Sequence, residues 1–242
     1  MKHIQSIGII GLGEFGRLVA QLAPAHVEVR GYDLASPRVS GVKQGNLAEV
    51  AQADVVVLAI PLQAYASHLP KLARVLPTST LLIDVCSVKV LPEQLFAQFL
   101  PNHSEILLTH PLFGPQRSAK EGIAGQRLIV TACQGKRAQK VLNFCDATLG
   151  LQIEHATSEA HDQVMAHAHA LTFFVARGLR ELNMHQLPFA APSLQLVTEL
   201  MQFEAAHSDA LFQTVQMGNP FAATMRQEVI RSLTKLDQRL RG

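Results

Sequence analysis

Tryptophan is absent from the sequence, and only two of its 242 residues are tyrosine. Proteins that bind single-stranded nucleic acids commonly stack the bases on aromatic side chains, and this sequence offers few side chains for such stacking. The net charge is only +2, and no run of basic residues concentrates it. Because a broad DNA-binding face needs such a concentration, we expect no nucleic-acid partner.

Cysteine is also scarce. Cys86, Cys133 and Cys145 are odd in number and match no zinc motif, which favours a reducing compartment such as the cytoplasm. Histidine does not suggest a metal site either: His167 and His169 are two residues apart on a predicted helix and would point about 200° away from each other. We predict a cytoplasmic protein without a bound metal.

Long hydrophobic runs are missing. The longest, over residues 55–62, is about a third of a membrane span. The first three residues, Met1-Lys2-His3, precede a strand-like segment and not the apolar region of a signal peptide. We therefore expect no membrane segment. Hydrophobic residues nevertheless make up 48% of the chain and charged residues 17%, enough to bury the core of one large or two modest domains.

Strand-like and helix-like patterns alternate through the first part of the chain. Such alternation predicts a Rossmann-type, doubly wound parallel sheet with right-handed crossovers. The predicted strands cover residues 4–10, 27–32, 55–60, 81–85, 106–109, 128–131 and 151–154, and the predicted helices cover 15–22, 62–76, 92–100 and 136–149.

The remaining sequence is helical in pattern. One long helix is predicted over 157–183, Pro188 and Pro192 interrupt the pattern, and two or three further helices end near Leu240. We therefore predict an α/β domain over 1–153 and a smaller all-helical domain over 154–242. The helical part is too small to bury its apolar faces alone, so a homodimer through the C-terminal helices is expected, with both chains lining each active site.

A glycine-rich motif follows the first predicted strand. Residues 11–16 read GLGEFG, a G-x-G-x-x-G pattern that opens a helix, and Asp33 ends the second predicted strand. In this pattern the first glycine permits a tight turn, the second lets the backbone approach a pyrophosphate, and the third allows close helix packing. A glycine turn of another α/β fold, with Asp33 as a surface carboxylate, is the alternative.

The motif predicts a bound dinucleotide. Asp33 can accept hydrogen bonds from the ribose hydroxyls, which favours NAD, while Ser36 and Arg38 leave NADP open. The segment 58–61 would lie beside the cofactor at a strand end. The expected cofactor-binding residues are Gly11, Leu12, Gly13, Glu14, Phe15, Gly16, Asp33, Ile60 and Pro61.

Two further passages follow predicted strands. Residues 83–89 read IDVCSVK, and residues 109–115 read THPLFGP. Together with the glycine-rich motif, they resemble the D-x-x-S-V-K and H-P-M-x-G-[TP] motifs of the prephenate/arogenate dehydrogenase family of tyrosine biosynthesis. His161-Asp162 followed by Leu171-Thr172 is a weaker similarity, and the Phe-Gly-Pro wording is closer to the arogenate-type branch.

The resemblance implies a reaction and its residues. A hydride would pass from C4 of an anionic cyclohexadienyl substrate to the nicotinamide, and the ring carboxylate would leave as CO2. His110 is expected to accept the proton of the ring hydroxyl. Ser87 would hydrogen-bond that hydroxyl or His110, although it is also placed to cap a helix. Lys89 would help to hold the site or an anionic group.

The chain departs from the family pattern at the substrate. Gln116 stands where the family commonly has glutamate, and Phe173 stands where a histidine commonly contacts substrate. His169 lies one turn before Phe173 on the same helix face and is the expected replacement. The usual arginine for a substrate carboxylate is missing from its context, which leaves three alternatives, Arg117, Arg177 and Arg226.

Two other functions fit parts of the sequence. One is a related β-hydroxyacid-type NAD(P) dehydrogenase for another small anion, but such enzymes often use a lysine of the helical domain, and none lies between Lys140 and Lys235. The other is a nucleotide-binding regulatory module without turnover. The choice between prephenate and arogenate, and any inhibition by tyrosine, stay open at this point.

Overall fold

The computed structural model describes residues 4–182, 189 and 191–242. It divides into two compact units, Met1–Ser158 and Glu159–Gly242. The predicted helix end at residue 183, Pro188 and the N-terminal Met1-Lys2-His3 lie outside the described residues. In the described part of the chain, no helix combines the length and apolar character needed to span a bilayer.

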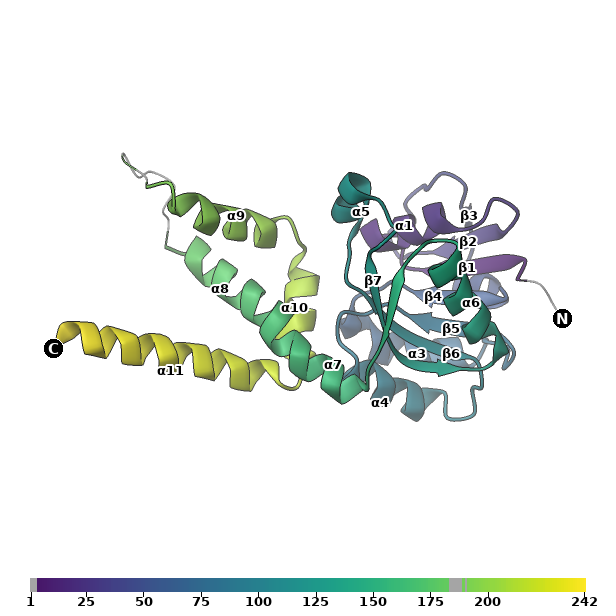
Figure 1. The fold of residues 1–242 in the computed structure, drawn as a ribbon. Helices are drawn as coiled ribbons and strands as arrows, with labels where there is room; N and C mark the ends of the chain where they lie inside the picture. The colour runs from purple at the N-terminus through teal and green to yellow at the C-terminus, as the bar shows by residue number, and fades with distance from the viewer. Residues whose placement is uncertain (1–3, 183–188, 190) are drawn as a thin grey trace. The chain divides into compact units, whose positions relative to one another are not determined.

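The first unit is built on an eight-stranded sheet with the order β3-β2-β1-β4-β5-β6-β7-β8 (Figure 1). Neighbouring strands are parallel except β6 and β7, which are antiparallel. The predicted doubly wound fold is therefore confirmed, with one reversed pair. The strands are β1 (Ser6–Ile10), β2 (Glu28–Tyr32), β3 (Lys43–Gln44), β4 (Val55–Leu58), β5 (Leu81–Asp84), β6 (Ile106–Pro111), β7 (Arg127–Gln134) and β8 (Gln152–His155).

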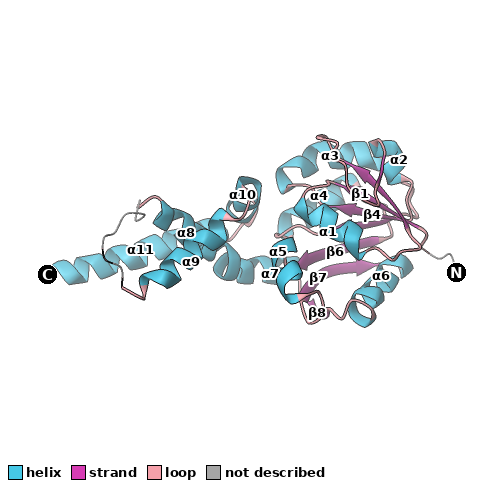
Figure 2. Ribbon diagram, turned by 90° about the horizontal axis from the view of Figure 1, so that it is seen from above, coloured by secondary structure: helices cyan, strands magenta, loops and turns pink. Residues whose placement is uncertain are grey.

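Helices cover both faces of this sheet (Figure 2). On one face, apolar residues of α2, α3 and α4 pack on the strands, and on the other face residues of α1 and α6 do so. Both faces of β4 and β5 are thus buried, which explains their continuous apolar sequences. The helices are α1 (Glu14–Leu22), α2 (Leu47–Ala51), the 3-10 turn η1 (Leu62–Ala64), α3 (Tyr65–Ala73), α4 (Val90–Phe99), α5 (Pro115–Glu121) and α6 (Lys136–Ala147).

Every predicted strand occurs, but three elements were not predicted. These are β3, α2 and α5. The strand β3 has only two residues, both exposed, so it carries no apolar alternation. The helix α2 has a visible signal, because Asn46 and Glu49 form a capping box. A β-bulge between β6 and β7 lies opposite the step from Leu108 to Thr109.

The regular secondary structure of the second unit is helical in its described residues. The predicted long helix consists of α7 (Ser158–Met165), the π-helical segment η2 (Ala166–Ala170) and α8 (Leu171–Arg180). It is followed by α9 (Leu194–Ala205), α10 (Asp209–Met217) and α11 (Ala222–Arg241). A small core joins η2 to α11 through Ala166, Ala170, Ala222 and Met225. The buried Gln216 donates a hydrogen bond of 2.6 Å to the Ala170 carbonyl of the π-helical segment.

A buried carboxylate links α8 to α9. Glu204 is 0% exposed, and its two oxygens accept hydrogen bonds of 2.6 Å from Arg177 and Arg180. Arg177 also pairs with Asp209 at 2.7 Å, and its guanidinium lies 3.8 Å from the centre of the Phe212 ring. The two arginines compensate the buried charge, so these contacts fix α8 against α9.

Candidate active site

The turn after β1 requires glycine at two of its three motif positions. Gly11 has a φ of +97°, and a Cβ there would lie 2.4 Å from the carbonyl oxygen of Ala59. A Cβ on Gly16 would lie 1.9 Å from the carbonyl oxygen of Gly11. Both clashes are with main-chain atoms, so the local backbone requires glycine at these two positions whether or not a ligand is bound.

Gly13 is different. It is exposed and immediately precedes α1, and a Cβ built on it would meet no atom within 4 Å. No side chain caps this helix end. A glycine with open space beside the N-terminal N–H groups of a helix is the arrangement that lets a backbone approach a pyrophosphate. The turn therefore fits the phosphates of a dinucleotide.

The other predicted cofactor residues divide into main-chain and side-chain roles. Leu12 is 1% exposed, so its side chain belongs to the core, while its N–H donates a 2.7 Å hydrogen bond to Asp33. Glu14 is exposed. The Phe15 ring lies 6.5 Å from the Phe113 ring, which connects the glycine-rich turn to the segment after β6.

Asp33 is held at the end of β2. One of its carboxylate oxygens accepts from Leu12 N, and the other accepts from Ala35 N at 2.8 Å. Ile60 is half-buried and Pro61 exposed, just after β4. Because β1, β2 and β4 are parallel, these positions share the carboxyl edge of the sheet, where ligands of open α/β sheets bind.

The two predicted catalytic residues lie at the same edge. His110 is in the last part of β6 and is 4% exposed. Ser87 is half-buried in the loop between β5 and α4. The strands β5 and β6 are parallel neighbours, with Asp84 opposite Leu108. The fold thus brings the two predicted residues to adjacent strand ends.

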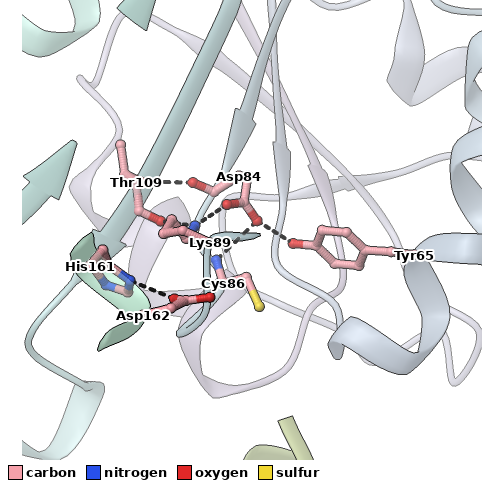
Figure 3. Close-up of polar contacts among 7 residues, drawn as sticks. All are labelled: Tyr65, Asp84, Cys86, Lys89, Thr109, His161 and Asp162. Carbon is pink, nitrogen blue, oxygen red and sulfur yellow. Dashed lines mark hydrogen bonds and ion pairs between the residues drawn. The ribbon is translucent and has the colours of Figure 1, made fainter. Parts of the chain in front are cut away.

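Lys89 is buried beside the two predicted catalytic residues. Its side chain is 0% exposed, forms an ion pair with Asp84 and donates to the carbonyl oxygen of Thr109 at 2.5 Å (Figure 3). Tyr65 also donates to Asp84, at 2.6 Å. Of the two roles expected for Lys89, holding the site together agrees with these buried contacts.

Sequence patterns missed Asp84, Tyr65 and Thr109. Asp84 stood inside the matched motif as the last residue of a strand, but its partners come from distant parts of the chain. Burial first, and then the charge of Asp84, raise the pKa of Tyr65 well above its ordinary value, so the phenol remains a hydrogen-bond donor. A lone tyrosine after a strand gives no sequence signal of this contact.

The other two residues predicted to bind substrate, Gln116 and His169, belong to different units of the chain. Gln116 is exposed in the first turn of α5. His169 belongs to the π-helical segment of the second unit, and its ring contacts Phe173 edge-on at 4.8 Å. Burial first, and then His207 and His161, lower the pKa of His169 to about 4, so it is neutral at physiological pH.

All three alternative arginines have partners within their own unit. Arg117 pairs with Glu121, and Arg177 pairs with Glu204 and Asp209. Arg226 donates to the main-chain and side-chain oxygens of Gln216 at 2.8 and 3.0 Å. No group of three His, Cys, Asp or Glu residues able to hold a metal ion occurs in residues 4–182, 189 and 191–242.

Part of the chain is similar to a known protein family. Residues 34–149 match the model described as "Prephenate dehydrogenase, nucleotide-binding domain". Arogenate dehydrogenase 2, chloroplastic, of Arabidopsis thaliana is 26% identical over 98% of this chain and 70% of its own length. Arogenate dehydrogenase 1, chloroplastic, of the same plant is 28% identical over 89% of this chain, which spans only 36% of that relative.

A solved structure has the same fold. Prephenate dehydrogenase from Aquifex aeolicus, crystallised with hydroxyphenyl propionate and NAD+, aligns with a TM-score of 0.78 and 19% identity. The alignment covers 98% of this chain and 91% of that one.

Proposed function

We propose that this chain acts as a prephenate/arogenate-type dehydrogenase and catalyses the NAD(P)-dependent oxidative decarboxylation of prephenate, arogenate or both. The products would be 4-hydroxyphenylpyruvate and tyrosine. The observation that carries the proposal is a shared edge: the glycine-rich turn, Ser87 and His110 all lie at the carboxyl ends of parallel strands of one sheet.

The residues have distinct tasks in this proposal. The turn over 11–16 binds the pyrophosphate, and Asp33 accepts hydrogen bonds from the ribose, which favours NAD. A nicotinamide held there would supply the acceptor for the hydride that leaves ring C4. His110 accepts the proton of the C4 hydroxyl, and Ser87 orients that hydroxyl. The bond to the ring carboxylate breaks as CO2 leaves, its electron pair completes the aromatic ring, and the C4 oxygen takes the proton back from His110.

Two departures from the family pattern concern the substrate in this proposal. Gln116 supplies an uncharged hydrogen-bonding group where the family commonly has a glutamate. His169, neutral because burial lowers its pKa, is the proposed substitute for the histidine that Phe173 replaces. The first unit then serves as the dinucleotide-binding domain and the second as the substrate and dimerisation domain. The cysteines Cys86, Cys133 and Cys145 are all free thiols, which supports a reducing compartment such as the cytoplasm.

The activity can be tested directly. The purified chain is supplied with prephenate or arogenate, each with NAD+ or NADP+, and reduced nicotinamide is followed by its absorbance. We expect turnover with at least one substrate and a preference for NAD+. Dinucleotide binding by calorimetry without turnover in any of the four combinations would instead identify a binding module, and absence of both would reject the proposal.

The dimer proposed for this protein uses α11. Val229, Leu233, Leu236 and Leu240 form a stripe spaced four, three and four residues apart, and the three leucines are 59%, 43% and 78% exposed. That spacing is typical of a coiled-coil seam. It reads the same in both directions, so two antiparallel copies of α11 can pair Leu233 with Leu236 and bring Leu240 next to Val229, which is half-buried against the core of its own unit. We propose a second copy of this chain as the occupant of the stripe.

The substitution Leu236→Glu is expected to weaken that dimer by at least about a hundredfold. Each copy loses a buried leucine, worth about 1.5–3 kcal/mol, and the loss occurs twice in a symmetric dimer. The matched control Gln238→Glu adds a charge on the opposite face of α11 and should leave the association unchanged. Sedimentation at micromolar concentration distinguishes them, and a wild-type monomer would contradict the dimer.

A further inference from the structure

A buried ion pair closes the loop that carries Ser87. Asp84 ends β5, Lys89 immediately precedes α4, and the two side chains are paired although both are 0% exposed. The carboxylate of Asp84 also accepts from the N–H of Cys86 at 3.1 Å. The two ends of the segment 84–89 are therefore joined, and the half-buried Ser87 lies within the closed loop.

The same pair reaches the strand that carries His110. Lys89 donates to the carbonyl oxygen of Thr109, the residue directly before His110, and the Thr109 hydroxyl donates to the main-chain oxygen of Asp84 at 2.8 Å. One ammonium group thus contacts the loop of Ser87 and the main chain beside His110. These contacts fix two neighbouring strand ends relative to each other (Figure 3).

Tyr65 extends this arrangement to the proposed cofactor edge. It begins α3, shortly after Pro61, and its 0%-exposed side chain approaches Asp84 from the side opposite Lys89 (Figure 3). The phenol hydroxyl donates to the carboxylate oxygen that also binds Cys86 N. The segment after β4 is thereby tied to the segments after β5 and β6.

Stability alone does not account for such a pair. Removing two charges from water is costly, and an apolar pair of similar size is often equally stable. The described residues form several ion pairs between a lysine or arginine and a carboxylate. Of those with a measured distance, Asp84–Lys89 is the pair in which both side chains are 0% exposed. It lies at the functional edge of the sheet, where fixed geometry contributes most to rate.

We propose that the Asp84–Lys89 pair, supported by Tyr65, is the positioning element of the active site. It fixes the positions of Ser87 and of the main chain next to His110 relative to each other, and it does so without contacting substrate. This inference rests on the proposed function for the roles of Ser87 and His110. Asp84, Lys89 and Tyr65 are positioning residues in this scheme.

The test is the double substitution Asp84→Asn with Lys89→Met in the full chain. It removes both charges, while the amide oxygen of the new side chain can still accept from Tyr65 and Cys86. We expect near-wild-type denaturant unfolding and an unchanged Kd for NAD+, but a kcat lowered about ten- to hundredfold. In NMR spectra, the imidazole signal of His110 should shift, whereas that of His103, bound to the Thr80 carbonyl at the opposite end of β5, should not.

A second variant removes no charge. Tyr65→Phe deletes one hydrogen bond to Asp84 and should lower kcat about threefold to tenfold. Its control is Thr80→Val, which deletes a buried hydroxyl bonded to the Ala53 carbonyl at 3.0 Å at the other end of β5. Thr80→Val should cost similar stability and leave kcat unchanged.

The outcomes separate the two proposals. If the double variant and Tyr65→Phe both keep wild-type kcat and an unshifted His110 signal, the pair serves folding only and the inference is overturned. If the wild-type chain turns over neither substrate, the proposed function fails. The NMR comparison of His110 with His103 still decides the positioning role in that case, because it needs no turnover.

Discussion

Replacing His110 with asparagine is expected to lower kcat by about a hundred- to ten-thousandfold, the usual contribution of a positioned acid–base group. Asparagine keeps a hydrogen-bonding side chain of similar shape but cannot accept a proton at neutral pH. The KM for NAD+ should change little, because His110 lies on β6 and the glycine-rich turn follows β1. Steady-state kinetics with the preferred substrate measures both quantities.

The pH dependence of this variant provides a second readout. Only the neutral imidazole accepts a proton, so kcat/KM of the wild-type chain should fall at acidic pH if His110 is the base. The variant should lack this acidic limb. As a control, His103→Asn changes a buried histidine bonded to Thr80 and should retain kcat per folded molecule. A His110→Asn variant with more than a tenth of wild-type kcat would exclude His110 as the proton acceptor.

Substitutions of Gly16 and Gly13, which lie in the same turn, are expected to differ in opposite directions for stability and for dinucleotide binding. Gly16→Ala places a Cβ 1.9 Å from the main-chain oxygen of Gly11, which no side-chain rotation can relieve, so it should destabilise the fold by about 3 kcal/mol or more. Gly13→Ala meets no protein atom within 4 Å, so its cost should be limited to the loss of a favourable N-cap residue, about 1 kcal/mol or less. Denaturant unfolding measures both effects.

For dinucleotide binding, Gly13→Ala should be the variant with the direct effect, although it is the less destabilising of the two. The methyl group of Gly13→Ala occupies the space proposed for the pyrophosphate, so calorimetry should give a Kd for NAD+ raised at least about tenfold in a fully folded protein. If Gly13→Ala binds NAD+ as the wild type does, the open space beside Gly13 is not the phosphate site. The proposed cofactor site would then have to lie elsewhere.

Local patterns were sufficient to predict the sheet and the cofactor turn. The strands β4 and β5 are buried on both faces, so their sequences are uninterrupted apolar runs, and the G-x-G-x-x-G motif encodes a turn whose sterics are local. The reversal of β7 was not predictable in this way. An apolar run does not indicate whether the neighbouring strand is parallel or antiparallel. The helix α5, which connects β6 to the reversed β7, begins with a proline that gives no further signal.

The contacts among Asp84, Lys89 and Tyr65 join segments that are distant in the sequence. Lys89 looked suited to an anionic substrate, because a lysine beside a motif is usually solvated. Its burial and its partners come from the pairing of β5 with β6 and from the packing of α3, which brings Tyr65 to Asp84. Single-sequence patterns carry no information about such tertiary partners, so Lys89 could be singled out from the sequence but its partners could not.

The π-helical segment Ala166–Ala170 holds about one residue more than an α-helical turn would need. Deleting one residue within it would convert the wide turn into an ordinary α-helical turn and leave α7 and α8 nearly in their present phase. The same deletion within α8 would rotate every following residue by about 100° and separate side chains that now share a face. The second unit should therefore tolerate a shorter chain at this segment better than within α7 or α8, at the cost of local contacts such as that of the Ala170 carbonyl with Gln216.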